Sequence, residues 1–352
     1  MGTYIIYSIV YSYALAFYVL VKGNLGFALF LLTLFLFAAL RGDVGADTCA
    51  YQEIYNLFNL RERELDFGRI EPLFALLNIV LNFMGFGHQS IFVVVAGLQT
   101  LIYLKIHQYA NPNTKWLLAF VVLIYYYSFY FNTIRYGLAV IAFSYAFILH
   151  LEGRDKLATI VAILSIGIHI AAAPLMLLMR GLAVRYIAVA AGSLYLYNSF
   201  IDTDLIVSKL EYVHYLLEYD YEFRASVDWF IVRSLTLLVV IIFLVRSIYY
   251  KFLFIFFILG VGTLDALMPV IGRFSEAYVF ILLIYLSYTE VDRRKLFYLY
   301  PFLFLSIYSH IAYPIINGDS ILKESRLSQG MSDIASGVKY HFFFESDKLV
   351  CK

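Results

Sequence analysis

Residues 25–40 read LGFALFLLTLFLFAAL, and residues 41–47, which follow directly, read RGDVGAD. The first stretch carries no charge and is typical of a membrane-spanning helix, which needs about 20 mostly apolar residues including its ends. The second stretch places an arginine, two aspartates and two glycines side by side. Such an abrupt change predicts a polar loop at the membrane surface, where it could contact a charged substrate.

Apolar runs of this kind recur along nearly the whole chain. Of its 352 residues, 62% are hydrophobic and 14% are charged, whereas soluble domains carry about 25% charged residues. The two cysteines are too few and too far apart for a disulfide framework or a metal site. The composition therefore predicts an all-α polytopic integral membrane protein with about 10–12 transmembrane helices. We predict spans at 3–21, 25–40, 90–106, 116–131, 135–150, 182–200, 229–246, 252–271, 274–289 and 296–313.

The loop charges predict how these spans are oriented. Short connections such as the one with Arg154 and Lys156 are basic, which favours the cytoplasmic side. The longer loops 41–71 and 201–228 are acidic, and we place both outside. Residues 1–313 would then form a single membrane domain, followed by an extracytoplasmic tail at 314–352.

Two further apolar segments must fit this orientation. Residues 72–84 are too short to cross easily and would lie on, or dip into, the outer face. Residues 157–179, interrupted by Gly167, His169 and Pro174, would be broken or re-entrant, with two half-helices meeting near His169. A break at membrane depth is tolerated where it lines a cavity. The alternative is one plain span that mildly violates the charge rule.

Charged residues within the spans mark candidate functional positions, because each costs about 2.5–3.5 kcal/mol at the bilayer centre. Five such charges occur, at Arg135, Arg233, Asp265, Arg273 and Glu276. All but Asp265 are predicted at the outer ends of their helices, on the same side as Arg41. Arginine suits a diphosphate, because its planar guanidinium binds two phosphate oxygens at once and stays charged.

Most of these charges also have a structural alternative. Arg233 could reach toward the surface and pair with Asp228, and Arg273 could form an ion pair with Glu276 three residues later. Asp265 could carry protons or, in its neutral form, bond a neighbouring helix.

A general base is the other group to look for. His169 lies between apolar neighbours and could either bond another helix or act as a base, since an unperturbed imidazole has a pKa of about 6.5. Asp47 in the outer loop competes with His169 for this role.

Several short motifs occur in a fixed order between residues 40 and 290. They are Arg41 with Gly45, Ala46, Asp47 and Tyr51; Glu71-Pro72; Asn132-x-x-Arg135; Ile168-His169; and Arg273 with Tyr278. In this order and spacing the chain resembles the EpsG/Wzy-type polymerases of bacterial exopolysaccharide and O-antigen. It departs from the pattern at Ala46, where the family often has threonine, at Tyr136, often glutamine, and at Ala171, often a small hydroxyl residue.

The resemblance implies a membrane glycosyltransferase of GT-C-like architecture. Such an enzyme would transfer a growing glycan from undecaprenyl diphosphate to the sugar of a lipid-linked repeat unit, on the outer face of the bacterial inner membrane. It would need no cofactor and no essential metal. Its implied partners are the undecaprenyl-diphosphate-linked oligosaccharide, membrane lipids and a chain-length regulator protein, with no nucleic acid.

On this hypothesis each candidate residue has an expected role. Arg135 and Arg273 would bind the diphosphate, with Arg41 organising the outer loop or adding a third contact. The remaining substrate-binding candidates are Asp43, Tyr51, Asn132, Arg233, Glu276 and Tyr278. Two alternatives stay open: a transporter or flippase of a lipid-linked or small anionic substrate, with Asp265 as its coupling group, and an O-antigen ligase-like glycosyltransferase.

Overall fold

The computed structural model describes nine parts of the chain, and every secondary-structure element in them is a helix. Because no strand occurs in these parts, the predicted all-α class is confirmed for them. The predicted loop 201–228 and the tail 314–352 lie outside the described residues. The described residues are 2–21, 23–41, 48–58, 70–179, 181, 232, 234–260, 269–292 and 294–307.

Helices α2, α5 and α7 follow the predicted apolar runs, with ends within four residues of the predicted ones. The predicted boundary between spans 252–271 and 274–289 is wrong, because α14 already begins at Pro269. The predicted span 182–200 lies outside the described residues. The labelled helices are α1 (Gly2–Leu20), α2 (Asn24–Ala39), α3 (Thr48–Leu57), α4 (Pro72–Phe83), α5 (Gln89–Tyr109), α6 (Lys115–Tyr127), η1 (Ser128–Asn132), α7 (Ile134–Leu151), α8 (Asp155–Ile168), η2 (Ile170–Leu178), α12 (Ile248–Ile255), η3 (Phe256–Gly260), α14 (Pro269–Tyr288), η4 (Lys295–Leu299) and α15 (Tyr300–Ile307).

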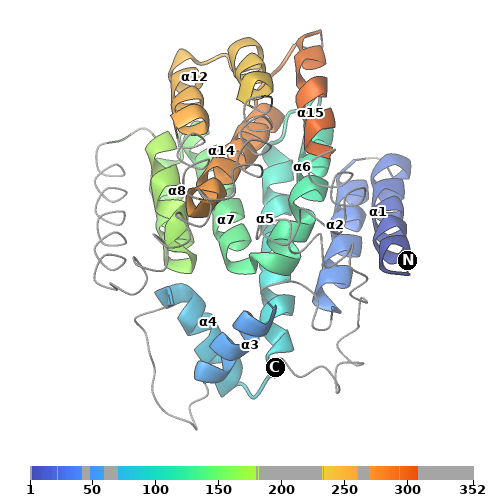
Figure 1. Ribbon diagram of the computed structural model, residues 1–352, viewed down its shortest axis with the longest axis vertical. Helices are drawn as coiled ribbons and strands as arrows, with labels where there is room; N and C mark the ends of the chain where they lie inside the picture. The colour runs from blue at the N-terminus through green and yellow to red at the C-terminus, as the bar shows by residue number, and fades with distance from the viewer. Residues whose placement is uncertain are drawn as a thin grey trace, which may run out of the picture.

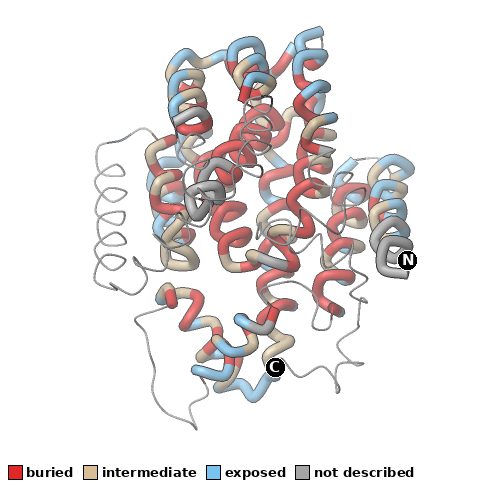
Figure 2. The backbone as a smooth tube through the Cα atoms, in the orientation of Figure 1, coloured by how far each residue is buried: buried red, intermediate tan, exposed pale blue. Residues whose placement is uncertain are grey.

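The long helices form a bundle around α7, with the short helices α3 and α4 at one end and α12 and α15 toward the other (Figure 1). Buried residues are concentrated along α7, α14 and the inner sides of α5 and α6 (Figure 2). A second, smaller core joins α3 and α4 to the first turns of α5 and α7, through residues such as Tyr51, Phe74, Phe92 and Leu138. The two short helices are therefore packed onto the bundle end where α7 begins.

Helix α5 illustrates how the bundle divides apolar side chains between core and surface. Its buried face carries Phe92, Gln99 and Tyr103, whereas Leu98 and Leu101 are exposed. This spacing of three, four and seven residues places one face of a helix against the core. Because the exposed face is as apolar as the buried one, it is suited to contact with lipid.

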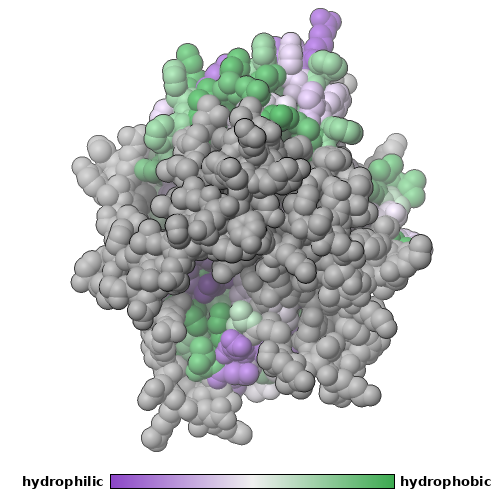
Figure 3. All heavy atoms as spheres, viewed as in Figure 1, coloured by the Kyte–Doolittle hydropathy of each residue, from purple (hydrophilic) through white to green (hydrophobic). Residues whose placement is uncertain are grey.

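Two helices, α5 and α7, are long and apolar enough to cross a membrane among the residues described. The other apolar helices have shorter described stretches of 10–17 residues, so the predicted total of about 10–12 spans is not established. Large apolar side chains are nevertheless exposed, for example Ile248, Phe252 and Phe304. Figure 3 shows such hydrophobic surface at the end of the molecule where α12 and α15 lie.

The predicted span 116–131 and the next span are joined by a π-helical turn, η1, which was not predicted. The amide of Thr133 donates to the Ser128 carbonyl at 2.8 Å, five residues back, and so skips the usual partner four residues back. A π-turn is inserted where a helix carries an extra residue, often at a functional site. Here the turn ends α6 and sets the direction in which α7 begins, with Arg135 in its first turn.

Carbonyl groups within this turn and at the start of α7 are bonded by side chains from two other segments. Gln99 of α5, itself fully buried, donates to the Phe129 carbonyl at 3.0 Å and to the Ile134 carbonyl at 3.2 Å. The Arg41 guanidinium donates to the Tyr130 carbonyl at 2.8 Å. Unpaired backbone groups are costly where water is excluded, so these bonds stabilise the break.

Close packing also fixes the angle between η1 and α7. A Cβ atom placed on Gly137 would lie 2.5 Å from Cβ and 2.8 Å from Cα of Phe129. Both distances are far below van der Waals contact. Only glycine lets the second turn of α7 approach η1 this closely.

The predicted break in 157–179 is confirmed. Helix α8 ends at Ile168, His169 is extended (φ −154°, ψ 121°), and a 3₁₀-helix, η2, begins at Ile170. Pro174, inside η2, has no amide hydrogen and so cannot continue an α-helix. Since η2 contacts both α7 and α14, the break lies within the bundle.

We expect Gln99→Leu to destabilise the protein by about 1–3 kcal/mol, because two buried carbonyls lose their donor. The midpoint of thermal unfolding, measured on purified protein in detergent, should fall. The control is Leu101→Ala, on the exposed face of the same helix, which should change the midpoint much less. Equal midpoints for Gln99→Leu and the wild-type protein would contradict the role given to Gln99.

Candidate active site

Glu71 stands at the point where the α3–α4 end of the molecule meets the bundle. It is the residue before α4, and Pro72 begins that helix with the fixed φ that suits a first helical position. The Glu71 side chain makes no cap bond to its own helix. Instead, its Oε2 lies 2.8 Å from Nη1 of Arg135, which is in the first turn of α7.

The second oxygen of Glu71 reaches the break after α8. Its Oε1 accepts the Ile170 amide hydrogen at 3.3 Å and lies 3.5 Å from Nδ1 of His169. The same Nδ1 accepts the Ala171 amide hydrogen at 3.1 Å. Glu71 therefore joins the N-terminus of α4, the start of α7 and the start of η2, and we call Glu71, Arg135 and His169 the Glu71 cluster.

A close approach of α8 to α4 brings the cluster together. A Cβ atom on Gly167 would lie 2.8 Å from Cδ1 of Leu73, two residues after Glu71. The small residue at 167 thus lets the end of α8, and His169 with it, lie beside the beginning of α4.

The cluster is enclosed but reachable. The side chains of Glu71, His169 and Arg135 are 15%, 17% and 20% exposed. The Arg135 guanidinium lies 5.5 Å from the centre of the Phe74 ring, and Tyr136 meets the His169 ring edge-on at 5.6 Å. Aromatic walls keep the local dielectric low, which strengthens charge interactions in the site.

This arrangement combines the groups needed to bind an anion and to transfer a proton. Arg135 is a permanent cation that could pair with a phosphate oxygen. His169 is an imidazole, whose ring nitrogens can accept or donate a proton. Both predicted residues are brought together by the fold.

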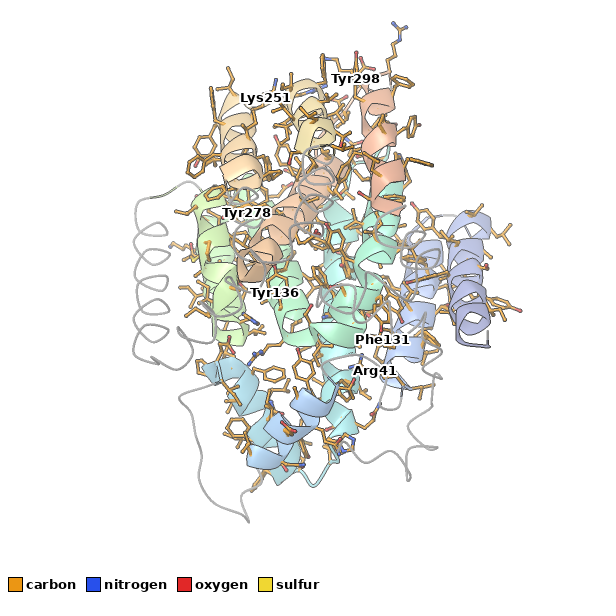
Figure 4. The ribbon with its side chains drawn as sticks, in the orientation of Figure 1. Arg41, Phe131, Tyr136, Lys251, Tyr278 and Tyr298 are labelled. Carbon is orange, nitrogen blue, oxygen red and sulfur yellow. The ribbon has the colours of Figure 1, made fainter. Side chains whose placement is uncertain are left out.

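Arg41, expected either to organise the outer loop or to add a third diphosphate contact, lies in the core. Its side chain is fully buried, 4.1 Å from the Phe92 ring centre and 4.9 Å from that of Phe131. Figure 4 shows Arg41 beside Phe131, and both residues are separate from Tyr136 in that view. With its bond to the Tyr130 carbonyl, Arg41 supports η1, one turn before Arg135.

Three other predicted residues lie in the core near the cluster or along α14. Tyr51 of α3 is buried, and its hydroxyl lies 3.5 Å from the Arg135 amide nitrogen, which donates to it. Glu276 is buried on α14 and accepts from the Tyr125 hydroxyl at 3.1 Å. Tyr278 donates to the Pro174 carbonyl at 2.8 Å and so ties α14 to η2.

The remaining predicted residues are not described in full. Asn132 is the last residue of η1, and Arg273 lies on α14 one turn before Glu276, but their side chains are outside the described parts. The positions wholly outside them are Asp43, Asp47, Arg233 and Asp265.

Glu71 is the residue that sequence reasoning did not assign to the site. It was noted only as part of the Glu71-Pro72 motif, because it lies in an acidic loop with six other carboxylates. A usable signal was present: proline at a helix start makes the preceding residue the cap. What the sequence could not show was that this cap residue turns toward Arg135, 64 positions later.

Comparison with protein families identifies the chain. A model of the EpsG family matches residues 24–323, a range that contains the whole Glu71 cluster and every helix from α2 to α15. No match was found among curated proteins or among solved structures. The family match covers most of the chain and agrees with the resemblance in the motifs, and it is consistent with a membrane-associated protein of polysaccharide polymerisation. The chain belongs to the EpsG family.

Proposed function

We propose that this protein is a membrane polysaccharide polymerase of GT-C-like architecture. It would transfer a growing glycan from undecaprenyl diphosphate to the sugar of a lipid-linked repeat unit, on the outer face of the bacterial inner membrane. The observation that carries the proposal is the Glu71 cluster, in which an arginine and a histidine meet at one end of the bundle. Family membership supports the same reaction class.

The reaction needs two kinds of assistance from the chain. A hydroxyl of the acceptor sugar attacks the anomeric carbon of the donor glycan, and the bond from that carbon to the diphosphate breaks. Arg135 would stabilise the negative charge that develops on the leaving undecaprenyl diphosphate. His169 would take the proton from the attacking hydroxyl, so that the products are a longer glycan and free undecaprenyl diphosphate.

The other predicted residues keep supporting roles in this proposal. Arg273, from the part of α14 nearest the cluster end, is a second candidate for the diphosphate, and Asp47 remains the competing base. Tyr51, which accepts from the Arg135 amide, would orient α7. We assign Arg41 the role of organising η1, on the basis of its contacts with Phe92, Phe131 and the Tyr130 carbonyl.

We expect Arg135→Ala to lower the polymerisation rate by roughly 10²–10³-fold, the usual effect of removing one preorganised group that stabilises a leaving anion. The assay uses purified protein in liposomes with the lipid-linked repeat unit extracted from cells that lack this protein. Product chain length is followed on gels. Long chains at the normal rate would exclude Arg135 from the reaction.

The matched control for this assay is Arg246→Ala. Arg246 also pairs with a glutamate, Glu290 at 3.4 Å, but its side chain is 64% exposed. Polymerisation by this variant should equal that of the wild-type protein. In cells, loss of a polymerase should leave single repeat units on the surface, whereas loss of a flippase should leave none, and the second result would favour the transporter alternative.

We expect Arg41→Lys to lower the thermal midpoint but to leave the affinity of the folded protein for undecaprenyl diphosphate unchanged. An ammonium group is a compact, strongly hydrated charge without the planar face and multiple donors of a guanidinium, so the support of η1 is weakened. Scanning fluorimetry and ligand titration measure the two quantities separately. Weaker binding with an unchanged midpoint would instead support direct contact between Arg41 and the diphosphate.

A further inference from the structure

The two oxygens of Glu71 serve different groups. Oε2 holds the guanidinium of Arg135 at 2.8 Å, and Oε1 lies between the Ile170 amide and Nδ1 of His169, at 3.3 and 3.5 Å. The ion pair with Arg135 and the contact with His169 are therefore made by the two oxygens of one carboxylate.

The His169 ring faces two groups that make opposite demands on Nδ1. The Ala171 amide, at 3.1 Å, requires Nδ1 to be an acceptor without a proton. The Glu71 carboxylate, at 3.5 Å, requires Nδ1 to carry a proton and to donate it. A neutral imidazole holds one proton, so Nδ1 can satisfy only one of these neighbours at a time.

The choice of neighbour decides what the other ring nitrogen can do. When Nδ1 accepts from Ala171, the proton of the neutral ring is on Nε2, which then donates. When Nδ1 donates to Glu71, Nε2 carries the lone pair and can accept a proton. The contact to Ala171 is the shorter of the two and favours the first arrangement, in which His169 is not a base at Nε2.

A phosphate group would compete directly with Glu71 for Arg135. Both are anions that bind guanidinium through oxygen, and Arg135 is 20% exposed. When Arg135 turns to the phosphate, Oε2 of Glu71 loses its cation. The negative charge of Glu71 is then best stabilised by a hydrogen bond donated to Oε1. Nδ1 of His169, 3.5 Å away, can supply this donor when it carries a proton.

We propose that Glu71 is a positioning residue that couples diphosphate binding at Arg135 to activation of His169 as a base, an inference that rests on the proposed polymerase function. Before the donor binds, Glu71 neutralises Arg135 and His169 has its proton on Nε2. After the donor binds, Glu71 accepts from Nδ1–H. The proton on Nε2 leaves to water as another reaches Nδ1, so the ring stays neutral. The Nε2 atom can then take the acceptor's proton only when the donor is in place.

This role predicts opposite effects of Glu71→Gln on binding and on turnover. The amide has no charge to compete for Arg135, so undecaprenyl diphosphate should bind about fivefold more tightly or better, the lower range of typical coupling between sites. The amide also accepts poorly from Nδ1–H, so turnover should fall by at least about 10²-fold. If Glu71 only stabilised the fold, Glu71→Gln would weaken binding and slow turnover together.

The experiment uses the full chain in nanodiscs. Binding is titrated with undecaprenyl diphosphate, and turnover is measured with the lipid-linked repeat unit extracted from cells that lack the protein. Tighter binding together with slower turnover in Glu71→Gln supports the coupling. Unchanged or weaker binding, or unchanged turnover, overturns it. Glu290→Gln, the same change in the exposed pair with Arg246, should alter neither quantity.

A second measurement does not depend on how well the variant folds. Nitrogen NMR of histidine-labelled wild-type protein distinguishes the two ring tautomers, with the His169 signal identified by its loss in His169→Gln. Addition of undecaprenyl diphosphate should move the proton of His169 from Nε2 to Nδ1. Bound ligand without this change overturns the coupling alone, whereas absence of ligand binding to the wild-type protein overturns the proposed function itself.

Discussion

The bonding of the backbone at η1 is the interaction on which the rest of the site depends. A π-turn between α6 and α7 leaves carbonyl groups without helical partners, and in a membrane no water replaces them. Gln99 and Arg41 bond the carbonyls of Phe129 and Tyr130 in the turn. Gln99 also bonds the carbonyl of Ile134, where α7 begins, and Tyr51 accepts from the amide of Arg135. The three residues come from different segments, so the start of α7 is fixed by α5, by the end of α2 and by α3 together. Arg135, in the first turn of α7, lies directly after this supported break.

A second break, at His169, completes the site from the opposite side. The extended residue between α8 and η2 turns its imidazole toward Glu71 and Tyr136. Tyr278 bonds the Pro174 carbonyl and holds η2 against α14, the helix that also carries Arg273. Two interrupted helices thus present their functional residues to one carboxylate.

The sequence predicted the helices well because apolar runs are the direct requirement of a membrane. It predicted the break at His169 from Gly167 and Pro174. The motifs assigned Arg135 to the diphosphate together with Arg273, and left His169 and Asp47 as competing candidates for the base. It did not predict η1, since FYFN in residues 129–132 is as apolar and aromatic as the helix before it. It also gave Arg41 a place among the substrate contacts. In the sequence, only the charge of Arg41 is visible, and a charge at the end of an apolar run suggests a functional role. The contacts of Arg41 with the Phe92 and Phe131 rings depend on tertiary packing, which the spacing of sequence motifs does not reveal.

The ion pair of Glu71 and Arg135 has a consequence for how the protein is made. An arginine carried alone into a bilayer would oppose insertion and would draw water into the bundle. With Glu71 as its counter-ion, the empty site bears no net charge from this pair, and α4 and α7 can assemble before any substrate arrives. A newly synthesised chain can therefore reach its folded state without waiting for a lipid-linked glycan.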